Sequence, residues 1–140
     1  MGKIALISSL LAICFSACAE DAHHASARLV KTELARLSGT SAVDCGLVPL
    51  GQSAERAWAC ALAAQKSKKP FWLAFQERSI DSVMWLAVGR DAHGNPYVLT
   101  YDSSPYGRPG LHPRISRDIC ASNTKFDPQA ENFGCRGFAP

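Results

Sequence analysis

Six cysteines in a chain of 140 residues limit its fold more strongly than any other feature. Two belong to an apolar N-terminal segment, and four lie in the remainder: Cys45, Cys60, Cys120 and Cys135. An even number of cysteines in a short chain is typical of disulfides that staple a small core, provided that the compartment is oxidising. Four cysteines allow three pairings, and we favour Cys45–Cys60 with Cys120–Cys135 because each closes a short loop.

The N-terminal segment, residues 1–19, has the pattern of a cleaved secretion signal. Lys3 supplies a positive start, residues 4–15 carry no charge, and small residues follow at 16–19 before the acidic Glu20. The apolar run is shorter than the ~18–20 residues that span a bilayer. We therefore expect export to an oxidising compartment, with a buried N-terminal helix or a retained anchor as the alternative.

Two processing routes fit this segment. Ala17 and Ala19 fit the small-x-small rule of ordinary signal peptidase, which would cleave before Glu20 and leave a periplasmic protein. Residues 15–18 also resemble the lipobox of bacterial lipoproteins, in which Cys18 is lipidated, although Phe15 stands where that pattern prefers Leu. In that family Ala19 after the cysteine implies anchoring in the outer membrane.

Removal of residues 1–19 leaves 121 residues, enough for one small domain with a modest core. That remainder holds 14 basic and 12 acidic side chains, and so weak a balance does not favour a nucleic-acid partner. No two cysteines have C-x-x-C spacing and no histidine flanks them in a zinc-like pattern, so we expect neither a metal site nor a cofactor.

Apolar spacing divides the remainder into a polar tether at 20–26 and a single α+β domain at 27–140. A first helix is expected at 27–37, where one apolar stripe recurs at helical spacing and consists of Ala27, Val30, Leu34 and Leu37. A second begins after Ser53, a good N-cap, and ends at Pro70. Residues 44–51, rich in glycine and proline, are expected to be irregular.

From residue 71 onward the spacing of apolar residues changes to the pattern that is typical of strands. Strands are expected at 71–76, 82–88 and 97–101, with a fourth at 114–120, and a hairpin at 90–96 joins the second to the third. The tail from 121 is expected to be irregular and fixed by Cys135. The predicted fold is α+β: two helices packed on one face of a three- to four-stranded antiparallel meander, stapled by two disulfides.

No arrangement of residues carries a specific catalytic signal. Three serines lie near an aspartate in the sequence: Ser82 follows Asp81, and Ser103 and Ser104 follow Asp102. Two histidines, His93 and His112, lie within the same region of the sequence. None occupies a G-x-S-x-G turn, and Asp followed by Ser is also usual in turns. We assign no catalytic residue.

Aromatic and arginine residues are the candidates for binding. If Phe71, Leu73 and Phe75 face the helices, then Trp72 points to the other side of the sheet. An exposed aromatic face with nearby arginines would suit protein binding, because Trp, Tyr and Arg dominate interface hot spots. The candidate binding residues are Trp72, Tyr97, Tyr101, Tyr106 and Arg108; the alternative is that the aromatic rings belong to the core.

The assembled pattern resembles small uncharacterised bacterial envelope proteins and lipoproteins. The residues that carry the resemblance are the signal with Cys18, Asp44-Cys45-Gly46 before an alanine-rich helix, Asp81-Ser82, and Tyr101-Asp102-Ser103. The resemblance implies neither a known activity nor a catalytic residue. The order of elements is also similar to that of periplasmic inhibitors and assembly factors, which bind proteins through a sheet face, an analogy of fold alone.

These observations favour a non-enzymatic envelope protein that binds another envelope or secreted protein, as an inhibitor, an immunity factor or an assembly accessory. Two alternatives remain open. One is a small periplasmic hydrolase that uses Ser103 or Asp102 with His93 or His112. The other is a purely structural lipoprotein, which would have no discrete exposed aromatic patch.

Overall fold

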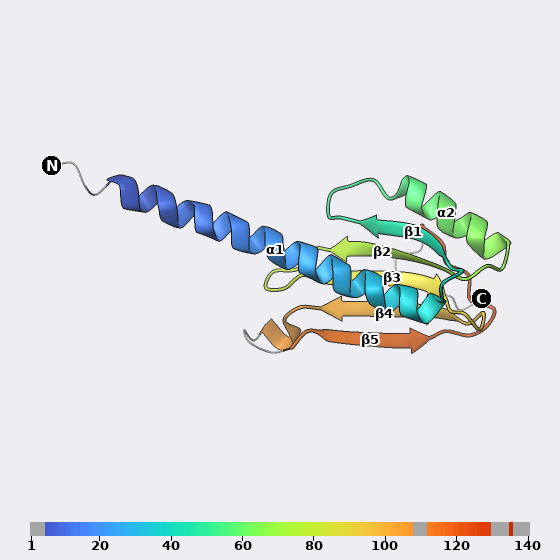
Figure 1. Ribbon diagram of the computed structural model, residues 1–140. Helices are drawn as coiled ribbons and strands as arrows, with labels where there is room; N and C mark the ends of the chain where they lie inside the picture. Colours follow the sequence, from blue (N-terminus) through green and yellow to red (C-terminus); the bar gives the residue numbers. More distant parts are fainter. Residues whose placement is uncertain (1–4, 108–111, 130–134, 136–140) are drawn as a thin grey trace.

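The computed structural model describes residues 5–107, 112–129 and 135, with the backbone alone for residues 5–21 and Tyr106. In chain order its elements are α1 (Ala5–Ser38), β1 (Val43–Val48), α2 (Glu55–Lys66), β2 (Phe71–Glu77), β3 (Met84–Arg90), β4 (Pro96–Asp102), the short 3₁₀ helix η1 (Pro105–Gly107) and β5 (Arg114–Ile119). The strands form one sheet in the order β1-β2-β3-β4-β5 (Figure 1). The predicted α+β class is confirmed.

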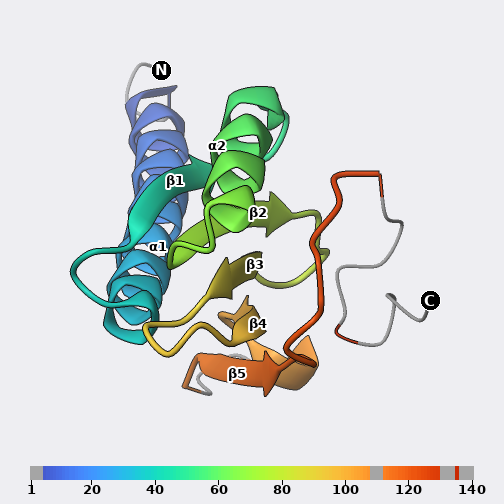
Figure 2. The same cartoon turned by 90° about the vertical axis from the view of Figure 1, so that its right-hand side faces the viewer.

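The two helices lie on opposite faces of the sheet, with α1 on one side and α2 on the other (Figure 2). The expectation of both helices on one face is therefore wrong. Alternation along β2 explains the arrangement: Trp72 and Ala74 pack in the core beneath α1, whereas Phe71 and Leu73 pack in the core with α2. Strands covered on both faces must be apolar on both, as β2 and β3 are.

Helix α1 is fixed to the sheet by a buried polar contact near each end of its packed part. Near one end the indole Nε1 of Trp85 donates a hydrogen bond to Ser26 Oγ over 3.1 Å. At the other end the hydroxyls of Ser38 and Tyr97 are hydrogen-bonded at 2.8 Å. Residues 20–26, expected to form a tether, thus belong to α1, and Ser26 is buried.

The predicted apolar stripe of the first helix is confirmed, because Val30, Leu34 and Leu37 are all buried against the sheet.

The ring of Tyr97 lies beside a glycine on the neighbouring strand. A Cβ atom at Gly89 would stand 2.6 Å from the Tyr97 hydroxyl, closer than a Cβ atom can lie unless the structure shifts. Glycine at this position makes room for the contact that holds the end of α1.

Strand β1 is the element that the sequence did not reveal. It pairs in parallel with β2, whereas the other neighbouring strands are antiparallel, and α2 connects the two. Its register shifts between Asp44 and Leu47, and Gly46 there has φ +101°. This bulge interrupts the alternation of apolar residues that identifies a strand. The sheet has five strands rather than three to four.

Both predicted disulfides are present. Cys45–Cys60 joins β1 to α2, with 5.5 Å between the Cα atoms, and Cys120–Cys135 joins the residue after β5 to the tail, with 4.9 Å. Each bond links residues that are 15 apart in sequence. A disulfide-stapled domain is consistent with an oxidising extracytoplasmic compartment.

We expect Ser38→Ala to lower the free energy of unfolding by ~1–3 kcal/mol, because it leaves the buried Tyr97 hydroxyl without its side-chain partner. Tyr97→Phe removes the other half of the pair, so the double variant should lose less than the sum of the single losses. Urea denaturation of the four proteins measures this coupling. Thr32→Ala on the exposed side of α1 is the control; equal losses in Ser38→Ala and Thr32→Ala would contradict the assignment.

Replacing Cys45 and Cys60 together by Ala should lower the free energy of unfolding by ~3 kcal/mol, the loop-entropy value for a bridge of this span. The pair Cys120 and Cys135 closes a loop of the same length and should cost a similar amount. Thermal and urea denaturation of the two double variants measure both losses. A loss below ~1 kcal/mol for either pair would show that its bridge does not limit the unfolded chain.

Candidate binding surface

Three of the residues predicted to form an exposed aromatic face lie in the core. Trp72, Tyr97 and Tyr101 have exposed fractions of 3%, 0% and 3%. Trp72 does point away from α2, as its position in the strand predicts, but α1 covers that side of the sheet. The expectation that these rings face solvent is therefore wrong. Tyr106 lies in η1 and Arg108 lies outside the described residues, so their predicted role stays a prediction.

The catalytic candidates do not converge. His93 lies in the turn before β4, whereas Asp102 ends that strand and Ser103 follows it, so about 20 Å of strand separates them. Burial would raise the pKa of Asp91, but hydrogen bonds from Asn95 and from His93 N hold it below the ordinary value. These bonds give Asp91 the structural role of closing the turn.

His112 precedes β5 at the same end of the sheet as Asp102, but the hydrogen bonds of the described residues do not connect it with Asp102 or Ser103. Ser103 Oγ instead accepts a hydrogen bond of 2.7 Å from Val83 N, and Asp102 Oδ1 accepts one of 2.9 Å from Ser104 N. Both groups serve to fix loops.

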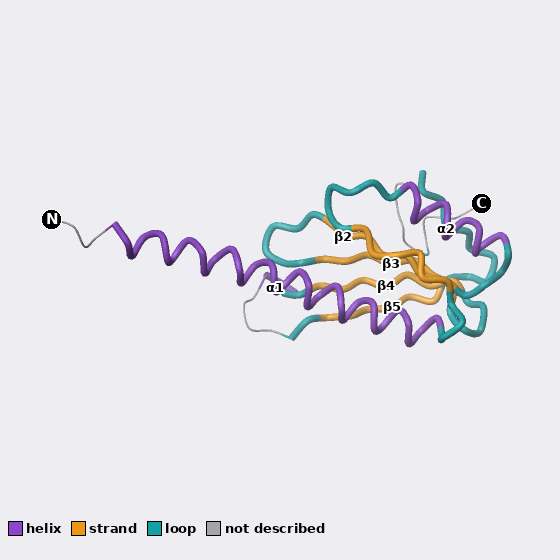
Figure 3. The backbone as a smooth tube through the Cα atoms, turned by 45° about the horizontal axis from the view of Figure 1, so that its top comes forward, coloured by secondary structure: helices purple, strands orange, loops and turns teal. Residues whose placement is uncertain are grey.

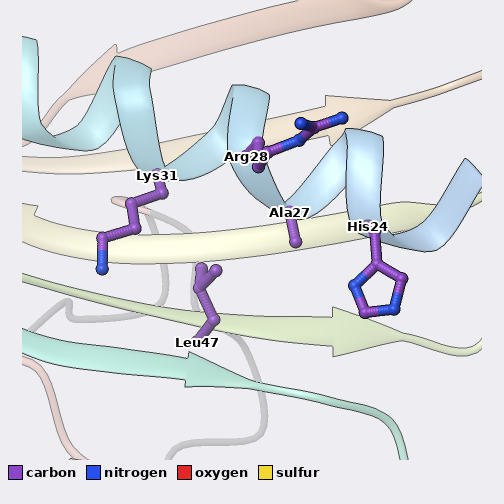
Figure 4. A pocket seen from close by; sticks show the side chains of 5 residues that line it. All are labelled: His24, Ala27, Arg28, Lys31 and Leu47. Carbon is purple, nitrogen blue, oxygen red and sulfur yellow. The ribbon is translucent and has the colours of Figure 1, made fainter. Parts of the chain in front are cut away.

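One open hollow lies beside residues 24–31 of α1, and another lies at the loops that follow β2 and β4. The first, of about 490 Å³, lies between α1 and β1, and Figure 4 shows His24, Ala27 and Lys31 directed from the helix toward the side of Leu47. Lys31 is ion-paired with Asp44 at 3.1 Å. The second, of about 370 Å³, is lined by Ser79, Ile80, Asp81, Ser82, Met84, Asp102, Ser104 and Gly107. Within the described ranges no three His, Cys, Asp or Glu side chains gather as a metal site would require.

Strand β5 is the most exposed part of the sheet. It is the last strand in the sheet, so within residues 5–107, 112–129 and 135 one of its edges has no neighbouring strand, and all six of its residues are exposed. Ile115 and Ile119 stand opposite Tyr101 and Tyr97 and hence on the face that α1 covers, yet 42% and 50% of their surface is exposed. These two side chains are exposed because α1 packs mainly over β2 and β3 and does not extend across β5.

One side of α1 borders this strand. Hydrogen bonds from Arg36 lower the pKa of the Glu33 carboxyl, and the charge of Arg117 on β5 lowers it further, which places Glu33 on the β5 side of the helix. Leu29 lies one helical turn before Glu33, on the same side, and is 50% exposed. We call Leu29, Glu33, Ile115, Arg117 and Ile119 the β5 surface.

The β5 surface combines two features of protein-binding sites. Its apolar side chains are half exposed around a central arginine, a composition typical of interfaces. Its open strand edge presents backbone N–H and C=O groups that another strand could pair with. The sequence predicted a strand here, but the exposure of its side chains depends on which strands α1 covers, and no local sequence pattern encodes that.

Comparison with known proteins identifies no relative: no family model matches the chain, and no curated protein and no solved structure gives a significant match. Among the residues that the structure describes, none of the helices combines the length and the apolar character needed to cross a membrane.

Burial raises the pKa of Tyr97 from 10.0 to about 12, which makes stability depend on alkaline pH. Between these values the unfolded chain has lost the phenolic proton while the folded protein keeps it. The stabilisation, about 2–3 kcal/mol, is therefore complete below pH ~10 and is lost as the pH rises through ~12. Urea denaturation from pH 9 to 12 measures it, and Tyr97→Phe should lack this part of the slope. Parallel curves for the two proteins would contradict the prediction.

Proposed function

We propose that this protein is an exported, non-enzymatic binding module that captures an extended segment of another envelope or secreted protein along β5. The observation that carries the proposal is the β5 surface, an open strand edge flanked by half-exposed Leu29, Ile115 and Ile119. Roles as an inhibitor, an immunity factor or an assembly accessory all require such a surface.

The chemistry of β5 defines the segment that would fit. A strand added to the edge places alternate side chains on each face of the sheet. On the α1 side those side chains meet Ile115, Arg117 and Ile119, so the best partner has an acidic residue between two apolar ones. Main-chain hydrogen bonds would supply affinity, and the apolar–acidic–apolar order would supply specificity.

Export and anchoring belong to the same proposal. The signal-like residues 1–19 and the two disulfides support an extracytoplasmic location, either free in the periplasm or attached to the outer membrane through a lipid on Cys18. The alternative of a purely structural lipoprotein accounts less well for a discrete apolar surface beside an open strand edge. A hydrolase would need His93 or His112 to reach a nucleophile or a carboxylate.

Site-specific photo-crosslinking in the producing cell tests the proposal. A benzophenone amino acid at positions 115, 117 and 119 should give adducts with one and the same peptide of one partner, because these side chains share a face of the strand. The same label at Ala59, exposed on α2, is the control. Adducts with unrelated proteins, or an equal yield of adduct from position 59, would contradict the proposal.

A negative charge at one of the apolar positions of the β5 surface should weaken capture without unfolding the domain. Ile115→Asp should weaken binding of the crosslinked partner at least tenfold, equivalent to ~1.4 kcal/mol, because it buries a carboxylate against apolar groups. Leu62→Asp on α2 is the matched control, since Leu62 is 40% exposed against 42% for Ile115. Equal affinities of the two variants would count against the β5 surface.

A further inference from the structure

Helix α1 leaves the domain at one particular end of the sheet. His23 Nδ1 lies 2.9 Å from Gln76 Nε2, and Gln76 Oε1 accepts a hydrogen bond of 3.2 Å from Leu50 N. These contacts place the helix at residue 23 beside the end of β2 and the loop after β1. From there α1 continues back to Ala5, about 27 Å beyond the domain (Figures 1 and 3).

The same end carries apolar side chains that face solvent. Parallel β1 and β2 end together, since Val48 pairs with Phe75, and the loops that follow hold Leu50 and Ile80. Ile80 is 99% exposed and Leu50 is 49% exposed. The loops at the opposite end, 39–42, 67–70 and 91–95, carry none of the large exposed apolar side chains that the structure describes.

We propose that this end of the domain contacts a lipid bilayer, with Ile80 and Leu50 entering its interfacial layer. The occupant follows from the direction of the helix, because α1 leaves the domain at this end, and the uncharged residues 6–15 extend from it where the N-terminal segment is retained as an anchor. A lipid on Cys18 would have the same effect, since residue 18 precedes His23 by about 7–8 Å along the helix axis. The inference rests on the proposed N-terminal attachment and is independent of the β5 surface.

Charge at this end defines the kind of lipid contact. The turn between β2 and β3 holds one basic and one acidic side chain, Arg78 and Asp81, and follows Glu77 at the end of β2, so this segment carries no net positive charge. Attraction to anionic headgroups therefore does not drive the contact, and apolar insertion must do so. Two exposed side chains are too few to hold a domain on a bilayer alone, which is why the contact acts together with an anchor.

The test uses the full chain, purified from membranes of the producing cell and reconstituted in phosphatidylcholine vesicles. A benzophenone amino acid replaces Ile80 in one protein and His93, exposed at the opposite end of the sheet, in another. We expect at least tenfold more lipid adduct from position 80 than from position 93. Equal yields, or no lipid adduct at position 80, would overturn the proposal.

A second measurement separates insertion from mere proximity. With the label at position 50, Ile80→Asp should lower the lipid adduct at least threefold, because a carboxylate resists entry into the interfacial layer. Leu62→Asp, at a site remote from this end, should leave it unchanged. An unchanged yield in Ile80→Asp would overturn apolar insertion. Crosslinks from β5 to a protein partner do not depend on either result, so the two proposals fail separately.

Discussion

The attachment of α1 to the sheet is the interaction on which the rest of the structure depends. Two aromatic residues supply it, because Trp85 and Tyr97 each pair a large apolar ring with a polar group that must find a partner when buried. Ser26 and Ser38 are those partners. Buried polar groups that are fully paired fix one arrangement, since a shift of the helix would leave them unpaired at a high energetic cost.

The two faces of the sheet are closed by different means. On the α1 side, large aromatic rings and two hydrogen bonds hold a long helix. On the other side, the small residues of α2 allow it to lie close to the sheet, Trp58 stacks on Phe75 at 5.4 Å, and a disulfide ties the helix to β1. Helix α2 has only 12 residues and therefore less apolar surface to bury than α1. The disulfide to β1 adds a covalent link that helps to hold this short helix on the sheet.

Local patterns predicted the elements that obey a simple period. The stripe of α1, the antiparallel strands and the pairing of cysteines 15 residues apart all follow from spacing within short windows. Strand β1 was missed because the bulge at Gly46 breaks its alternation. The start of the packed helix was missed because Ser26 looks like a linker residue until its partner Trp85, 59 positions away, is known.

The error over Trp72 has the same origin and explains why the binding surface was sought in the wrong place. Alternation along a strand tells which side a residue faces, but it does not tell what covers that side. Once α1 is placed over β2 and β3, the aromatic residues become core and exposure moves to the uncovered strand β5.

One helix thus fixes both proposed surfaces. Because α1 packs over β2, β3 and β4, the side chains of β5 stay exposed, and because it leaves the domain beside Gln76, its N-terminal residues project outward from the end that bears Ile80. The strands run from that end to the other, so β5 would begin at the bilayer end with Arg114 and extend away from the bilayer to Ile119. The two proposed surfaces share no residue, so a partner strand on β5 and a lipid contact at Ile80 and Leu50 would use different side chains.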